Sequence, residues 1–149
     1  MNTLNIDTPV GKMYLKSDGE NITELKFGSC ENDSPDEVLI KAKTELEEYF
    51  AGARKSFTLP LRPEGTGFQR SVWRALCEIP YGETSTYSQI AEKIGNKKAC
   101  RAVGMANNRN PIAIIIPCHR VVGANGSLTG YAGGLDKKEF LLELEAQRR

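Results

Sequence analysis

The residues best suited to chemistry lie at the end of the most apolar segment of this chain. The run Pro111–Pro117 is followed at once by Cys118 and by His119, the only histidine among the 149 residues. A thiol becomes a strong nucleophile only as a thiolate, and a nearby imidazole can take its proton. Adjacent side chains often point apart, so this pair needs a turn or an intervening water to communicate. Cys118 is a candidate nucleophile, and the alternative is a buried small hydrophobic residue.

An acidic side chain could orient that imidazole. A helix is predicted over residues 137–147, where Glu145 shares a face with Leu141. Glu145 therefore lies closer to the apolar side of this helix than Glu139 or Glu143. The alternative is a glutamate on the surface of a terminal helix.

The other cysteines do not suggest a structural framework. They are widely scattered with no CxxC pair, and an intracellular protein of this kind is not expected to form disulfides. With a single histidine, no pair of ligands has zinc-finger spacing. We therefore expect no metal and no cofactor. The four cysteines are Cys30, Cys77, Cys100 and Cys118.

Composition and charge favour an ordinary soluble protein with one basic region. Hydrophobic residues make up 40% and charged residues 26%, and no apolar run approaches the length of a membrane span. The first residues lack a secretory pattern, which predicts an intracellular, cytoplasmic protein. Residues 1–66 carry 8 basic and 12 acidic side chains, whereas residues 67–149 carry 12 basic and 7 acidic. Between Lys93 and Arg120 there are six basic residues and no acidic one, which suits phosphate binding or a merely solvated face.

The pattern of elements predicts a mixed α/β (α+β) chain of two small domains. Short strands are predicted over residues 4–7, 12–16 and 22–27, followed by a helix that begins near Pro35 and stops at Gly52. A segment rich in proline and glycine, residues 56–67, is the best linker candidate. We therefore expect an N-terminal sheet-plus-helix domain over residues 1–62. A mostly helical domain over residues 63–149 is expected to hold the candidate nucleophile.

Two short helices in the second half form a helix-turn-helix pattern. Thr86–Gln89 fits a capping box, Gly95 suits the end of the first helix, and Asn96 can cap a second helix over residues 97–108. The second helix has small side chains, which let a backbone approach a groove closely but read few bases. A helical hairpin packed in a core is the alternative.

These motifs together resemble the O6-alkylguanine-DNA alkyltransferases, also called methylated-DNA–protein-cysteine methyltransferases. The segment Pro117–Val121 resembles their active-site signature, and the resemblance covers about residues 67–146. Further matches in family order are Phe68-Gln69, Val72-Trp73, Ile79–Thr84, Tyr87, Arg101–Gly104, Asn110-Pro111 and Gly130-Tyr131.

The resemblance implies a reaction and a set of catalytic residues. An alkyl group would pass irreversibly from O6 of a damaged guanine in DNA, and from O4 of an alkylated thymine, to Cys118, once per molecule. The thiol of Cys118 would be activated by passing its proton through a water to His119, and Glu145 would lie on the other side of the imidazole. Asn110 would brace the active-site turn, and Tyr87 would protonate the guanine ring as it leaves.

The resemblance also implies how a monomer of this protein would engage double-stranded DNA. The second helix of the helix-turn-helix would enter the minor groove, the damaged nucleotide would rotate out, and Arg101 would fill the gap. The other implied DNA contacts are Asn96, Lys97, Lys98, Ala99 and Ala102. The implied walls of the base pocket are Val121, Tyr131, Ala132 and Gly133. Because other members carry serine or a bulkier residue at the position of Ala132, we expect a mouth that admits groups larger than methyl.

Two other functions remain compatible with parts of the sequence. A DNA-binding protein could recognise alkylated bases without repairing them, although relatives of that kind replace the cysteine that this chain keeps. A cysteine hydrolase could use the same three side chains, but it would not explain Arg101 or the basic helix-turn-helix.

Overall fold

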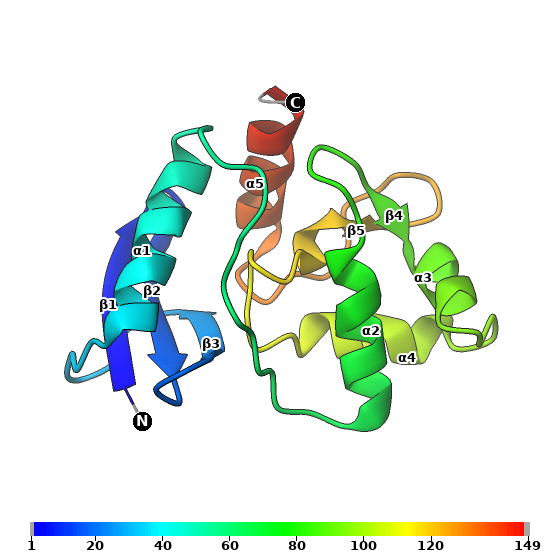
Figure 1. The fold of residues 1–149 in the computed structure, drawn as a ribbon. Coiled ribbons are helices and arrows are strands. Elements are labelled where there is room, and N and C mark those ends of the chain that lie inside the picture. Colours follow the sequence, from blue (N-terminus) through cyan, green and yellow to red (C-terminus); the bar gives the residue numbers. More distant parts are fainter. Residues whose placement is uncertain (1, 148–149) are drawn as a thin grey trace. The chain divides into compact units, whose positions relative to one another are not determined.

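The computed structural model describes residues 2–147. The chain divides into two compact units, Met1–Glu64 and Gly65–Arg149, whose elements are labelled in Figure 1. The first holds a three-stranded sheet and one long helix, and the second is mostly helical. The mixed α/β class predicted from the sequence is confirmed.

The sheet of the first unit is an antiparallel meander. Strands β1 (Asn2–Thr8), β2 (Gly11–Ser17) and β3 (Ile22–Phe27) pair in the order β1-β2-β3. Buried side chains alternate with less buried ones along β1 and β2, so that one face of the sheet is buried. The predicted strands are confirmed, with β1 and β2 each extending beyond the predicted bounds.

Helix α1 (Glu37–Phe50) covers that buried face. Asp36 caps it by accepting a hydrogen bond from the amide of Leu39, and its apolar stripe includes Leu46 and Tyr49, both essentially unexposed. The stripe packs against all three strands, which places the core of this unit between the helix and the sheet.

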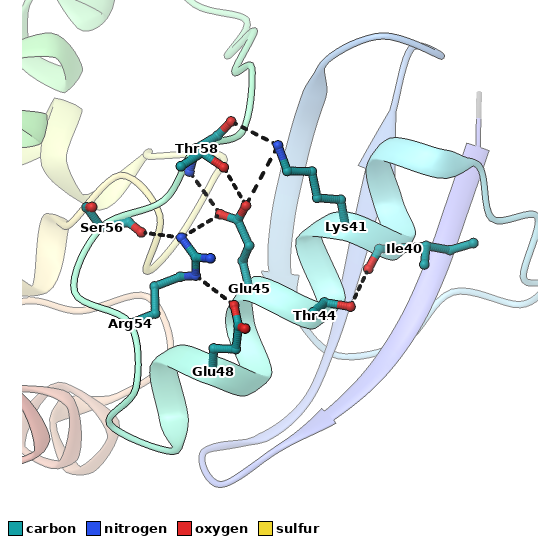
Figure 2. Close-up of polar contacts among 8 residues, drawn as sticks. All are labelled: Ile40, Lys41, Thr44, Glu45, Glu48, Arg54, Ser56 and Thr58. Carbon is teal, nitrogen blue, oxygen red and sulfur yellow. Dashed lines mark hydrogen bonds and ion pairs between the residues drawn. The ribbon is translucent and has the colours of Figure 1, made fainter.

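The segment after α1 is tied back onto the first unit by a buried carboxylate. Glu45, 3% exposed, accepts hydrogen bonds from the amide and hydroxyl of Thr58 at 2.9 and 2.6 Å, and ion pairs with Arg54 and Lys41 complete the cluster (Figure 2). Further along, the backbone of Ile22 bonds to both Pro60 and Arg62. The first half of the predicted linker is therefore fixed to this unit.

The second unit is built on three helices that contact one another. They are α2 (Gly67–Cys77), α3 (Tyr87–Lys93) and α4 (Cys100–Asn108). Capping boxes begin two of them, Thr66 with Gln69 in α2 and Thr86 with Gln89 in α3. The indole of Trp73 donates to the carbonyl of Ala106 at 2.9 Å, which locks α2 to α4.

The end of α3 is as predicted, but the start of α4 is not. Gly95 has φ 82°, the left-handed conformation that ends a helix. Helix α4 begins at Cys100 with Ala99 as its cap residue, three residues later than predicted. Asn96 does not cap it, because residues 97 and 98 form a turn in which the Asn96 carbonyl accepts the amide of Ala99.

Candidate active site

A short parallel pairing joins the segment that leads into Tyr87 to the segment that follows Cys118. Strand β4 (Ser85–Thr86) pairs with β5 (Val121–Val122), Ser85 opposite Val121. Tyr87 follows β4 directly as the first residue of α3. Cys118 and His119 lie in a 3-10 turn, η1 (Cys118–Arg120), that runs straight into β5. The pairing thus holds together two segments that are about thirty residues apart in sequence.

Asparagine side chains shape the backbone that leads into Cys118. The Asn110 side chain accepts the amide of Ile112 at 3.0 Å and donates to the carbonyl of Ile116 at 2.8 Å, closing a turn around the apolar run. Asn107, 1% exposed, donates to the carbonyl of Cys118 at 3.3 Å. The predicted bracing contact of Asn110 is present in the geometry, and Asn107 adds a second brace.

The turn holds one residue in a strained conformation. Ile114 has φ 70°, the only positive φ of a non-glycine residue among residues 2–147. The left-handed region is costly for a β-branched side chain, and such strain persists only where the surroundings over-determine it. The buried apolar run and the Asn110 bonds provide that constraint.

The imidazole, the carboxylate and an arginine form one buried cluster. His119 Nε2 lies 2.6 Å from Glu145 Oε2, and the two side chains are 0% and 1% exposed. The guanidinium of Arg120 donates to both oxygens of the same carboxylate, at 2.8 and 3.1 Å, and to the carbonyl of Ile79 at 2.7 Å. Glu145 therefore faces inward, and the alternative of a surface glutamate is wrong.

The bonds within this cluster fix the tautomer of His119 that can accept a proton at Nδ1. Burial raises the pKa of Glu145, but the bonds from His119 and Arg120 outweigh it and bring that pKa down to about 2. A carboxylate only accepts hydrogen bonds, so Nε2 must carry the hydrogen. Burial lowers the pKa of His119, which keeps the ring neutral. Its Nδ1 is then an acceptor, and it is buried with no hydrogen-bond partner among the described residues.

Cys118 is held as a neutral thiol in this state. It is 5% exposed, and burial raises its pKa to about 11 although a bond from Asn110 and the charge of Lys138 act in the opposite direction. The thiol must therefore lose its proton within the site to become reactive. Neutral His119, the next residue in the chain, is the candidate base.

A fully buried lysine, Lys138, lies on the same face of α5 (Leu135–Gln147) as Glu145. Its ammonium donates to the carbonyls of Val121 and Thr129 at 2.5 and 2.6 Å. Thr129 Oγ1 in turn lies 2.9 Å from the hydroxyl of Tyr87. These bonds connect α5, the segment after β5, and α3 around the site.

The residues expected to contact DNA lie on and before α4. Arg101, the second residue of that helix, is exposed, and so is Ala102 beside it. Asn96, Lys97 and Lys98 are exposed in the preceding turn, and Ala99 is half-buried. Met105, one turn after Arg101, is 57% exposed and adds an apolar side chain to this surface.

The residues expected to line the base pocket differ in how far they are buried. Val121 is completely buried in β5, next in chain to the catalytic turn. Tyr131 is half-buried, and burial raises its pKa, to which the negative charges of Cys118 as a thiolate and of Glu145 add. Ala132 is exposed and Gly133 half-buried. Tyr131 thus lies near the sulfur, while Ala132 faces solvent.

Sequence reasoning missed several residues that build the site. Lys138 could have been found, because it lies three and seven residues before Leu141 and Glu145 on one helical face. Asn107 and Thr129 act through contacts made across the fold, for which the sequence carries no periodic signal.

Within residues 2–147, no group of three or more His, Cys, Asp and Glu side chains could hold a metal ion. The same residues include no helix long and apolar enough to cross a membrane.

Comparisons with known proteins place this geometry in a family. Residues 67–147 match the model of the 6-O-methylguanine DNA methyltransferase DNA binding domain, and residues 4–63 match that of its ribonuclease-like domain. The methylated-DNA–protein-cysteine methyltransferase of Methanosarcina acetivorans is 58% identical over 147 residues, 93% of this chain and 94% of that protein. The crystal structure of Mycobacterium tuberculosis OGT in complex with DNA aligns with a TM-score of 0.92 at 47% identity, covering 99% of this chain and 94% of that one. Schizosaccharomyces pombe Atl1, solved with damaged DNA containing O6-carboxymethylguanine, covers 55% of this chain and 78% of its own, with a TM-score of 0.50 and 33% identity. The chain belongs to the methylated-DNA–protein-cysteine methyltransferase family.

Proposed function

We propose that this protein repairs alkylated DNA by taking the alkyl group from O6 of guanine onto Cys118, once per molecule. The observation that carries the proposal is the buried cluster beside that cysteine. His119, held by Glu145 at 2.6 Å, keeps a buried Nδ1 available as a base, and the residue before it in the chain is a thiol that burial leaves neutral. In a chain of this family, that arrangement is suited to alkyl transfer from damaged DNA.

The proposed reaction is a displacement at the alkyl carbon. His119 accepts the thiol proton, directly or through a water, and becomes an imidazolium stabilised by Glu145. The sulfur of Cys118 then bonds to the alkyl carbon while the bond from that carbon to O6 breaks. The electron pair stays on the purine, and a proton from Tyr87 goes to the guanine ring. The product thioether has no easy reverse route, so one site repairs one lesion.

The decisive test is the mass of the protein after exposure to damaged DNA. We expect incubation with a duplex containing one O6-methylguanine to raise the intact mass by one methyl group in place of one hydrogen. Peptide mapping should place the group on Cys118, and the same duplex with guanine should leave the mass unchanged. Tight binding of the damaged duplex without a mass change would instead indicate a protein that recognises lesions without repairing them. Continuous turnover of an ester or amide would indicate a hydrolase.

We also propose that the protein binds double-stranded DNA as a monomer. Helix α4 and the turn before it would lie in the minor groove. The exposed basic residues Lys97, Lys98 and Arg101 attract phosphates, and the small Ala102 allows close approach. A base inside a stacked duplex must rotate out before Cys118 can reach it. Arg101 is the exposed side chain of α4 long enough, and placed early enough, to enter the vacated stack.

Arg101→Ala is expected to slow repair of duplex DNA by roughly 10-fold to 100-fold, because filling the gap offsets part of the unstacking cost. Its reaction with free O6-benzylguanine, which needs no extrusion, should keep the wild-type rate. Single-turnover rates on both substrates measure this difference. Arg74→Ala, which removes an exposed arginine from α2, is the matched control and should change neither rate. Equal losses on duplex and free base would contradict a role in extrusion.

A further inference from the structure

We propose that Thr129 is a positioning residue for alkyl transfer, which acts by holding and polarising the hydroxyl of Tyr87. The inference rests on the proposed function, in which Tyr87 supplies a proton to the departing guanine. Thr129 lies in the loop between β5 and α5.

The contact itself links two distant parts of the chain. Thr129 Oγ1 lies 2.9 Å from the hydroxyl of Tyr87, and both side chains are half-buried. Either oxygen can donate in this bond, because each hydroxyl is both donor and acceptor. Thr129 can therefore accept from Tyr87 before proton transfer and donate to it afterwards.

The backbone of Thr129 is anchored more firmly than the surrounding loop. Residues 124–127 are exposed, but the carbonyl of Thr129 accepts a hydrogen bond from Lys138 at 2.6 Å. The same ammonium donates to the carbonyl of Val121 at 2.5 Å and is completely buried. A buried ammonium is stable only when its hydrogen bonds are made, so Lys138 fixes Thr129 in the loop to the same point as Val121 in β5. The threonine hydroxyl thus has a fixed position from which to meet Tyr87.

The chemistry explains why a hydroxyl is useful there. As the carbon–O6 bond breaks and the electron pair moves onto the purine, Tyr87 gives its proton to the ring and becomes a phenolate. A hydrogen bond that favours the charged form of a group makes its proton easier to release. Thr129 supplies that bond to the phenolate oxygen. At the end of the reaction Tyr87 recovers a proton from solvent, and His119 releases to solvent the proton that it took from Cys118.

The test compares Thr129→Val, which keeps the shape but removes the hydroxyl, with Thr129→Ser, which keeps the hydroxyl. On a duplex with one O6-methylguanine, Thr129→Val should lower the single-turnover rate by roughly 10-fold to 100-fold, the effect of one hydrogen bond to a charged group. Thr129→Ser should restore most of that rate. In a Tyr87→Phe background, replacing Thr129 by valine should change the rate no further, because the group on which it acts is gone.

A second reagent separates this role from a general disturbance of the site. Iodoacetamide alkylates a thiol with loss of iodide, a leaving group that needs no proton. The folded protein reacts with iodoacetamide, and the modification of Cys118 is then quantified on its peptide after digestion. The rate should be the same in Thr129→Val as in the wild type. A wild-type rate for Thr129→Val on damaged duplex, or an equal loss in the Tyr87→Phe background, would overturn the inference. If the wild-type protein itself gained no alkyl group from the duplex, the proposed function would fail instead.

Discussion

Replacing Cys118 by alanine is expected to abolish alkyl transfer while leaving binding to lesion-bearing duplex at the wild-type level. The sulfur is the atom at which the new bond forms, and alanine offers no nucleophile. The turn should survive, because residue 118 is held through its main chain: its amide donates to Ile116 and its carbonyl accepts from Asn107. Intact mass after incubation measures transfer, and fluorescence anisotropy of a labelled duplex measures binding.

Two matched variants make that result specific. Cys77→Ala removes an exposed cysteine at the end of α2, and Cys100→Ala removes the half-buried cysteine that begins α4. Both should gain one alkyl group per molecule, as the wild type does. Alkylated Cys118→Ala protein would identify another acceptor and defeat the proposed mechanism. A Cys118→Ala protein that bound no DNA would show that the thiol has a structural task in the turn.

Local signals in the sequence predicted which helices and strands carry the site more accurately than they predicted where those elements begin and end. The Thr86 capping box and Gly95 bound α3 as expected, because caps and left-handed glycines follow from residue type at a fixed spacing. The predicted start of α4 was wrong because Asn96 is a residue type that often caps helices but is not placed to cap this one. The turn at residues 97 and 98 uses the Asn96 carbonyl instead of its side chain. Such competition between a cap and a turn is decided by tertiary packing, which a pattern does not contain.

The inward position of Glu145 was predictable, whereas the hydrogen bonds of Lys138 and Thr129 were not. Helical periodicity placed Glu145 on the face of Leu141, and the 2.6 Å bond to His119 follows from that face being buried. Lys138 lies on the same face, but a lysine is normally read as a surface residue because burying its charge is costly. The bond between Thr129 and Tyr87 spans 42 residues and depends on the path of a loop, so no local pattern could reveal it.

Replacing Glu145 by glutamine is expected to damage both the reaction and the fold. In the wild type the carboxylate accepts from His119 Nε2 and leaves Nδ1 as the base. A glutamine amide can donate to Nε2 and so favour the tautomer with hydrogen on Nδ1, which cannot accept the thiol proton. The rate on damaged duplex should fall by roughly 100-fold to 10,000-fold, the range for loss of a general base. Removing the charge also leaves Arg120 buried without its anion, which should cost about 3 kcal/mol or more in the free energy of unfolding.

The pH dependence of stability distinguishes this ionic contribution from a simple packing defect. The pKa of Glu145 falls from 4.5 to about 2 on folding, so its contribution is complete above pH 4.5 and is lost as pH falls towards 2. Urea unfolding should be measured from pH 7 to pH 2. The free energy of unfolding of the wild type should exceed that of Glu145→Gln at pH 7, and the difference should shrink as the pH falls from 4.5 towards 2. Glu143→Gln, an exposed change on the same helix, should track the wild type throughout. A difference between wild type and Glu145→Gln that stayed constant down to pH 2 would mean that the carboxylate charge does not hold the cluster together, and the activation of His119 would need another source.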